Sequence, residues 1–178
     1  DLVRSRGLGD VYKRQPNSGL PTLSVDYHID FTHPLIGYQR LQFELNPASF
    51  TELLSGARTF CFYDEVARLR EMGLIRGGSL DCAVVLTHDA VMNPDGLRYP
   101  DEFCRHKALD LIGDLALIGK PLVARIIAQR AGHALHTDLV LRLLRTRSAW
   151  REVRAEQLAR AATADSRSIT PAATATAS

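Results

Sequence analysis

The chain has 178 residues, of which 46% are hydrophobic and 24% are charged, as in an ordinary soluble globular protein. These values exclude a wholly disordered chain, a coiled coil and a collagen-like repeat, and the length suits one domain with its own core. Lys and Arg number 22 against 20 Asp and Glu, so the net charge of +2 gives no electrostatic footprint for nucleic acid. No apolar stretch approaches the ~18 uncharged residues of a transmembrane segment.

The cysteines and the first residues indicate the compartment. Cys61, Cys82 and Cys104 are an odd number without CxxC or CxxH spacing, so we expect small core residues and no disulfide framework or cysteine zinc site. Residues 1–15 mix charges throughout and lack the apolar block of a signal peptide. We therefore expect a cytoplasmic protein.

The two ends differ from the middle of the chain. Residues 1–19 show neither strand nor helix periodicity and finish in a Pro-Asn-Ser-Gly turn cluster, so we expect a non-native leader there. Residues 154–178 are rich in Ala, Thr and Ser and carry too little apolar surface to offset the entropy of ordering. We expect a disordered tail there and one folded domain over residues 20–153.

The folded part opens with a predicted hairpin. Apolar and polar residues alternate over 23–31, which predicts a strand, and a turn at Gly37–Tyr38 leads into a second strand at 39–45. Asn46–Pro47 combines an N-cap with a first-turn proline and predicts a short helix to about residue 54.

The next segment has the pattern of a small βαβ unit. A strand is predicted at 59–62, a helix at 64–72 that ends at Gly73, and an apolar strand at 82–86. The unit is followed by a turn at 93–96.

Three further elements complete the domain. A long helix is predicted from about residue 102 to 118, an apolar strand at 122–128 and a last helix at 134–144. Strands and helices mixed in this order predict an α+β fold, a two-layer sandwich of a mixed β-sheet against helices, with the βαβ unit as a small insert.

The long helix carries the first candidate site. His106 and Asp110 are four residues apart, so their side chains share one face, which Asp114 extends by a turn. An imidazole and a carboxylate at this spacing can bind one divalent ion, but the same pattern also occurs as an ion pair on a solvated face. The opposite, apolar face is predicted to consist of Phe103, Leu109 and Ile112.

His133 stands at the start of the last helix, where a carboxylate such as Asp114 can fix its tautomer and support its charged form. The alternative interpretation is an exposed histidine without a role. His28 and His33 are expected to be strand and turn residues rather than ligands. Apolar residues of the βαβ unit are interpreted as core, or alternatively as the lining of an acyl-chain channel: Phe60, Phe62, Val66, Leu69 and Ile75.

Five segments, taken in order, resemble one known family. They are IDFTHPLIG (29–37), ARTFCF (57–62), GLIRGGSLDCAVV (73–85), NPDGLRYPDEFCRHKALDLIGDL (93–115) and AGHAL (131–135). Together they are similar to the C-terminal domain of UDP-3-O-acyl-N-acetylglucosamine deacetylase, a zinc-dependent amidase of lipid A synthesis. The resemblance extends over about residues 25–150 and includes neither end.

The resemblance implies roles for individual positions. His106 and Asp110 match two Zn²⁺ ligands, and Lys107 matches a lysine that faces the substrate cleft. His133 matches the general acid for the leaving amine, and Asp114 matches the aspartate that orients it. The positions that match the sugar-binding segment and the hydrophobic tunnel for the acyl chain are Thr59, Phe60, Phe62, Val66, Ile75 and Val85. The implied substrate is UDP-3-O-acyl-N-acetylglucosamine.

The sequence departs from the family in two respects. The family's third zinc ligand and its general base form an adjacent Glu-His pair in the N-terminal domain, and no Glu-His pair occurs here. A catalytic zinc normally holds three protein ligands. In addition, AGHALH stands where the family usually has SGHALN. We therefore expect a truncated deacetylase that is inactive without its N-terminal domain, and whose docking face is exposed.

Two other hypotheses remain open. The chain could be an interaction module that keeps the fold and binds an acyl chain or a partner without catalysis. It could also be an α+β domain in which His106 and Asp110 form only an ion pair. Binding of a fatty-acyl UDP-sugar without metal distinguishes the first hypothesis from the enzyme. Zinc binding by the two-domain protein, with and without Asp110→Ala, tests the second.

Overall fold

A computed structural model describes residues 22–72, 80–154 and 156–157. The predicted leader, 1–19, and nearly all of the predicted tail, 154–178, lie outside these residues. Within the described ranges no helix has both the length and the apolar character needed to span a membrane.

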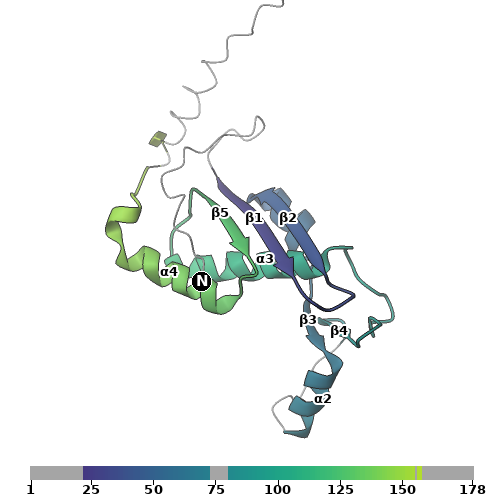
Figure 1. Ribbon diagram of the computed structural model, residues 1–178. Helices are drawn as coiled ribbons and strands as arrows, with labels where there is room; N and C mark the ends of the chain where they lie inside the picture. Colours follow the sequence, from purple (N-terminus) through teal and green to yellow (C-terminus); the bar gives the residue numbers. More distant parts are fainter. Residues whose placement is uncertain (1–21, 73–79, 155, 158–178) are drawn as a thin grey trace, which may run out of the picture.

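The main sheet has three strands in the order β2-β1-β5 (Figure 1). β1 (Leu23–Asp30) pairs antiparallel with β2 (Tyr38–Glu44) and parallel with β5 (Ala124–Gln129). The predicted hairpin is thus confirmed, and the strand predicted at 122–128 joins the other edge of β1. A sheet with both pairings is mixed, as expected for this α+β fold.

β1 is the central strand, and its alternation explains the position of the core. Leu23, Val25, Tyr27 and Ile29 are all buried and point to one face, which α3 covers. On the other face the buried Asp26 forms an ion pair with Arg40 at 2.8 Å, and His28 Nε2 lies 3.0 Å from the same carboxylate. His28 is therefore a strand residue, as predicted.

Two long helices pack together on the covered face of the sheet: α3 (Glu102–Leu115) and α4 (His133–Arg145). In Figure 1, α3 crosses the strands and α4 runs beside it. The predicted apolar face of α3 was only partly right. Phe103 is buried, but Leu109 and Ile112 are half-buried. The helix instead buries a stripe of residues spaced four, three and four apart: Cys104, Ala108, Leu111 and Leu115.

The shorter helical segments depart from regular α geometry. Asn46 caps α1 (Pro47–Ser49) through a reciprocal bond with Ser49, as the sequence indicates, but the chain continues as the π-helix η1 (Phe50–Leu54). The long helix also ends earlier than predicted, because η2 (Ala116–Ile118) is a 3₁₀ turn. Beyond α4 lies a further 3₁₀ turn, η3 (Arg147–Ala149).

The predicted βαβ insert is confirmed. β3 (Thr59–Phe62) and β4 (Ala83–Leu86) pair in parallel as a second sheet, and α2 (Tyr63–Glu71) connects them and projects from the domain in Figure 1. The ring of Phe60 contacts those of Phe31 and Phe103 edge-on, which anchors the insert to the main core.

The cysteines differ in their surroundings. Cys104 is buried, Cys61 is half-buried and Cys82 is exposed. The prediction of three core cysteines is therefore wrong for Cys82, because this residue lies in the turn before β4 rather than in the strand.

Candidate active site on helices α3 and α4

The first part of the site lies on one face of α3. His106 Nε2 is 3.3 Å from Asp110 Oδ1, and Lys107 Nζ is 3.3 Å from Asp110 Oδ2. The helical spacing of three and four residues produces both contacts. All three side chains are mostly shielded, with exposed fractions of 16–17%. The sequence prediction that His106 and Asp110 share a face is confirmed.

The neighbours of His106 fix its orientation. Its Nδ1 lies 3.3 Å from the Ala57 carbonyl oxygen, to which an Nδ1–H donates. In a neutral ring Nε2 then carries only a lone pair, yet it faces a carboxylate oxygen of Asp110. Two lone pairs facing each other need a cation between them, which can be a proton or a metal ion.

The charge balance of this pair follows from the same contacts. Burial lowers the pKa of His106, but the hydrogen bond and charge of Asp110, with the Ala57 carbonyl, outweigh it, so the pKa lies above its ordinary value. Burial acts to raise the pKa of Asp110, and the hydrogen bonds and charges of His106 and Lys107 outweigh it, so this pKa is lowered. The metal-free pair therefore favours a proton between imidazole and carboxylate.

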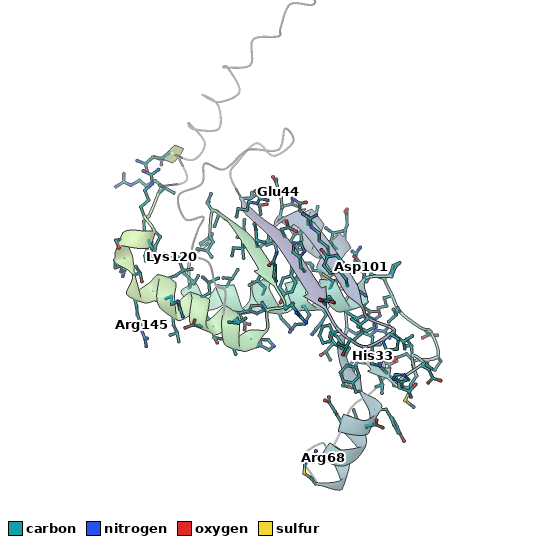
Figure 2. All side chains as sticks on the ribbon, in the orientation of Figure 1. His33, Glu44, Arg68, Asp101, Lys120 and Arg145 are labelled. Atoms are coloured by element: carbon teal, nitrogen blue, oxygen red, sulfur yellow. The ribbon has the colours of Figure 1, made fainter. Side chains whose placement is uncertain are left out.

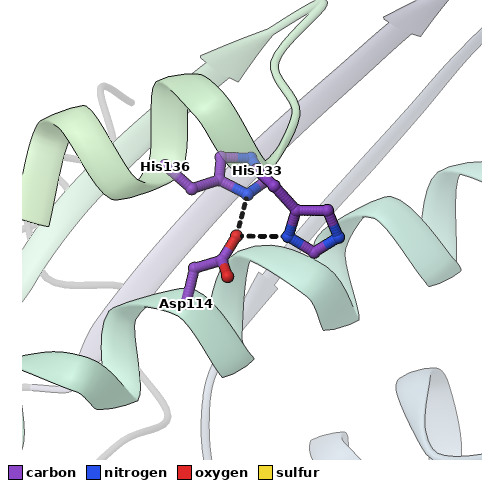
Figure 3. Close-up of side chains that lie close together, drawn as sticks. All are labelled: Asp114, His133 and His136. Carbon is purple, nitrogen blue, oxygen red and sulfur yellow. Dashed lines mark hydrogen bonds and ion pairs between the residues drawn. The ribbon is translucent and has the colours of Figure 1, made fainter.

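The second part of the site centres on Asp114, one turn further along α3. Asp114 Oδ2 is 2.7 Å from His133 Nδ1 and 2.8 Å from His136 Nδ1, both of which come from the first turn of α4 (Figure 3). Two imidazole N–H groups thus donate to one carboxylate oxygen. The other nitrogen of His133, Nε2, lies 3.7 Å from Asp110 Oδ2, so this imidazole stands between the two carboxylates of α3.

His133 and His136 differ in exposure, although they are three residues apart on the same helix. The side chain of His133 is 65% exposed, whereas that of His136 is 2% exposed. His136 Nε2 lies 3.0 Å from the hydroxyl of Tyr27, a fully buried residue of β1. Burial lowers the pKa of His136 below its ordinary value, although Asp114 acts in the opposite direction. His133 is therefore accessible, and His136 belongs to the core.

His136 was missed as a site residue by the sequence reasoning. Two signals were present: its spacing of three from His133 on a predicted helix, and its place at the end of the AGHALH segment. Neither signal indicates that Asp114 would lie between the two rings, because that depends on how α4 packs against α3.

Two sets of side chains could hold a metal ion. Asp114, His133 and His136 each offer one ligand atom, and these atoms lie within 4.8 Å of one another. Tetrahedral ligands about 2.0 Å from a zinc ion are about 3.3 Å apart. The Asp114 contacts of 2.7 and 2.8 Å are shorter than this and match hydrogen bonds. The His106–Asp110 separation of 3.3 Å matches a ligand edge.

The candidate substrate-binding residues lie on the insert, and the start of β3 reaches the site. Ala57, whose carbonyl faces His106, is two residues before Thr59, which is exposed. Phe60 and Phe62 follow on β3 and are half-buried. Val66 and Val85 are also half-buried, on α2 and β4, and Ile75 lies outside the described residues.

An open hollow of about 410 Å³ lies where the insert meets the β1–β2 connection, and it is lined by Phe31, Thr32, His33, Pro34, Phe62 and His88. His33 at this junction is labelled in Figure 2. Its Nε2 is 3.1 Å from the Thr87 carbonyl oxygen, and its ring contacts that of Phe62 in a tilted arrangement with centroids 5.1 Å apart. His33 thus lies in the turn region after β1, as predicted, and it also contacts the insert and forms one wall of the hollow.

Comparison with known proteins gives the family. The sequence profile of LpxC, described as UDP-3-O-acyl N-acetylglycosamine deacetylase, matches residues 6–145. This match begins inside residues 1–19, where we expected a non-native leader.

Curated relatives carry the same name. UDP-3-O-acyl-N-acetylglucosamine deacetylase of Anaeromyxobacter dehalogenans is 47% identical over 147 residues, which are 82% of this chain and 47% of that protein. Its counterpart in Nitratidesulfovibrio vulgaris is 52% identical over 120 residues, 67% of this chain and 38% of that protein. The protein of Phenylobacterium zucineum is 48% identical over 153 residues, 85% of this chain and 52% of that protein. The chain thus spans about half the length of these relatives, and it belongs to the UDP-3-O-acyl-N-acetylglucosamine deacetylase family.

Proposed function

We propose that this chain is the C-terminal part of a zinc-dependent amidohydrolase that removes the N-acetyl group from UDP-3-O-acyl-N-acetylglucosamine in lipid A synthesis. The observation that carries the proposal is the convergence of two proposed zinc ligands with an oriented, accessible imidazole. His106 and Asp110 are 3.3 Å apart, and His133 lies 3.7 Å from Asp110 while Asp114 holds its other nitrogen. The family membership supports the same conclusion.

His106 and Asp110 are the proposed metal ligands. The Ala57 carbonyl leaves His106 Nε2 free to bind a metal, and the facing Asp110 oxygen supplies a hard anionic donor. A bound zinc ion would polarise the amide carbonyl and lower the pKa of a bound water from ~15.7 towards ~7. Among the described residues no third His, Cys, Asp or Glu completes a group of three around this pair. We therefore propose that a further ligand and the general base come from an N-terminal domain.

His133 is the proposed general acid. Its exposed ring can reach a substrate, and the 2.7 Å bond from Nδ1–H to Asp114 leaves Nε2 pointing to the side of Asp110. A protonated imidazole in this position stabilises the oxyanion of the tetrahedral intermediate and then donates its proton to the departing nitrogen. Asp114 holds the required tautomer and stabilises the charged ring.

Lys107 is proposed to face the substrate. Its Nζ is 3.3 Å from Asp110 Oδ2, and a Cβ added to Gly132 would lie 3.6 Å from the same atom. The ammonium group therefore lies between the carboxylate of α3 and the residue that precedes His133. A cation here can assist in stabilising negative charge on the reacting amide.

The insert is the proposed acyl-binding region. Thr59 and Phe60 lie on the strand that begins beside His106, and Phe62 lines the open hollow. We propose that three further residues of the insert contact the acyl tail: Val66, Ile75 and Val85. Burying a long acyl chain stabilises the complex by ~0.8 kcal/mol per CH₂, and this remote binding energy can position the amide. We further propose a cytoplasmic location, where a UDP-linked sugar would be met.

A completed protein tests the proposal. Joining the chain to the part of the Anaeromyxobacter dehalogenans relative that it does not match should give zinc-dependent release of acetate from the UDP-sugar substrate. Asp110→Ala should remove bound zinc and reduce turnover at least about 100-fold. Asp138→Asn, on the exposed side of α4, is the matched control and should change neither. Unaltered zinc content in Asp110→Ala would refute the ligand assignment.

The chain alone provides the complementary measurement. We propose that the 178-residue chain binds zinc weakly and has no useful turnover, because two protein ligands are fewer than a catalytic zinc requires. Nanomolar zinc affinity in a titration of the chain would contradict this. Binding of the fatty-acyl UDP-sugar without metal, combined with an inactive completed protein, would instead support a binding module.

A further inference from the structure

Asp114 is held by two imidazoles, and the mechanism uses only one of them. Its Oδ2 accepts hydrogen bonds from His133 and from His136 at 2.7 and 2.8 Å. Among the described residues these are the only two side chains that hydrogen-bond to Asp114. We propose that His136 is a positioning residue, which fixes the Asp114 carboxylate so that the general acid His133 is held in its working orientation. This inference rests on the proposed function.

The positions of the protons in this network can be worked out from the acceptors. Asp114 Oδ2 accepts, so His136 Nδ1 carries a proton and donates it. The other ring nitrogen, Nε2, lies 3.0 Å from the hydroxyl oxygen of Tyr27. That hydroxyl donates its one hydrogen to the carbonyl oxygen of Ala131, which is 2.9 Å away and two residues before His133. The rings and the chain therefore form a closed loop of contacts that begins and ends beside His133.

Burial explains why His136, rather than His133, can fulfil this role. His136 is 2% exposed and held at both nitrogens, so its ring has little freedom to move. His133 is 65% exposed and has Asp114 as its partner within 3 Å. A carboxylate bonded only to His133 would move with that ring. With His136 as a second donor, Asp114 is fixed to the core of the domain.

Asn and Gln at position 136 separate the two bonds. The amide nitrogen of asparagine is at about the same distance from the backbone as Nδ1 of histidine, so His136→Asn keeps a donor for Asp114 and loses the contact with Tyr27. The longer glutamine places its amide near Nε2, so His136→Gln keeps a partner for Tyr27 and loses the donor for Asp114. Both substitutions place an uncharged amide in the same buried position.

The two variants are compared in the completed protein described above. We expect His136→Asn to retain kcat within about threefold, and His136→Gln to lose kcat about tenfold or more, with KM within about twofold in both. Zinc content should be unchanged in both. Equal kcat in the two variants, whether at the parent level or equally low, would overturn the inference. Loss of zinc in His136→Asn would also overturn it, because His136 would then be a ligand.

A measurement on the 178-residue chain itself does not depend on catalysis. Long-range ¹H–¹⁵N correlation spectra report which nitrogen of each imidazole is protonated. We expect His136 Nδ1 to carry a proton, and a shift of the His133 ring signals in His136→Gln that His136→Asn lacks. A His136 protonated only on Nε2 would overturn the inference. An inactive completed protein with the expected spectra would refute the proposed function and leave this hydrogen-bond assignment standing.

Discussion

Asp110 and Asp114 are the same residue type, one helical turn apart on α3, yet their surroundings differ. Asp110 faces three ionisable nitrogens, of His106, Lys107 and His133, at 3.3 to 3.7 Å. Asp114 accepts two short hydrogen bonds of 2.7 and 2.8 Å from imidazoles of α4. The contacts around Asp110 are long enough to admit a metal ion, whereas those around Asp114 are already hydrogen bonds.

The difference comes from packing rather than from the helix itself. The Asp110 turn of α3 lies near the start of β3, and Ala57, two residues before that strand, orients His106. The Asp114 turn faces the first turn of α4, which supplies two imidazole donors. One carboxylate thus keeps a cation-binding environment, and the other holds His133, the proposed general acid. The comparison explains how a single stripe of a helix can supply two functions.

Replacing Asp114 is the strongest test of the proposal that Asp110 and Asp114 have different functions. In the completed protein, Asp114→Asn should keep zinc at the parent level, because we propose no metal contact for this side chain. Turnover should fall at least about 100-fold, because an amide neither stabilises a charged His133 nor selects its tautomer. Metal analysis together with initial rates decides the matter. Loss of zinc in Asp114→Asn would show that the two carboxylates are not separated in function.

The contact of Tyr27 with His136, which holds Asp114, predicts an effect on stability. Tyr27→Phe removes a buried hydroxyl that contacts both His136 Nε2 and the Ala131 carbonyl. Leaving buried polar atoms without their partner costs about 1–3 kcal/mol. Urea denaturation of the 178-residue chain should show a loss of this size, and Tyr38→Phe, at a 64% exposed residue, should change the free energy of unfolding by less than about 0.5 kcal/mol. Equal losses in both variants would contradict the anchoring role.

Much of the fold could be predicted from the sequence because local patterns determine it. Alternation marks β1 and β2, the Asn46–Pro47 pair marks the start of α1, and the strand-helix-strand pattern marks the insert. The sequence did not reveal the π-helix η1 or the buried face of α3. Both depend on how the segments pack together, which no local pattern records.

The candidate site shows the same limit. The contact of His106 with Asp110 follows from helical spacing and could be predicted. The bond between Asp114 and His133 joins residues 19 positions apart on two helices. The sequence suggested Asp114 as one carboxylate that could contact His133, and the resemblance to the family supported that pairing, but no spacing rule fixes it. The role of His136 depends on a third element, β1, through Tyr27, and no spacing rule connects these residues.

The smallest expected effect concerns His106, beside Asp110, and His136, beside Asp114. The pKa values of these two histidines are shifted in opposite directions. The pKa of His136 is lowered, mainly by burial, so the unfolded chain binds the extra proton and the folded state loses stability as the pH falls below about 6.5. The pKa of His106 is raised, because Asp110 and the Ala57 carbonyl outweigh burial, so its contribution is fully present below about 6.5 and is lost as the pH rises through the folded value.

Replacing each histidine by asparagine separates the two contributions. In metal-free chain, lowering the pH from 7.5 to 5.5 should destabilise His136→Asn less than the parent and His106→Asn more than the parent. Each difference is bounded by about 1.4 kcal/mol per pH unit, the effect of one extra bound proton. Urea denaturation at the two pH values measures both. If the two variants shifted in the same direction, the environments of Asp110 and Asp114 would be electrostatically alike, and the packing of α4 against α3 would not distinguish them.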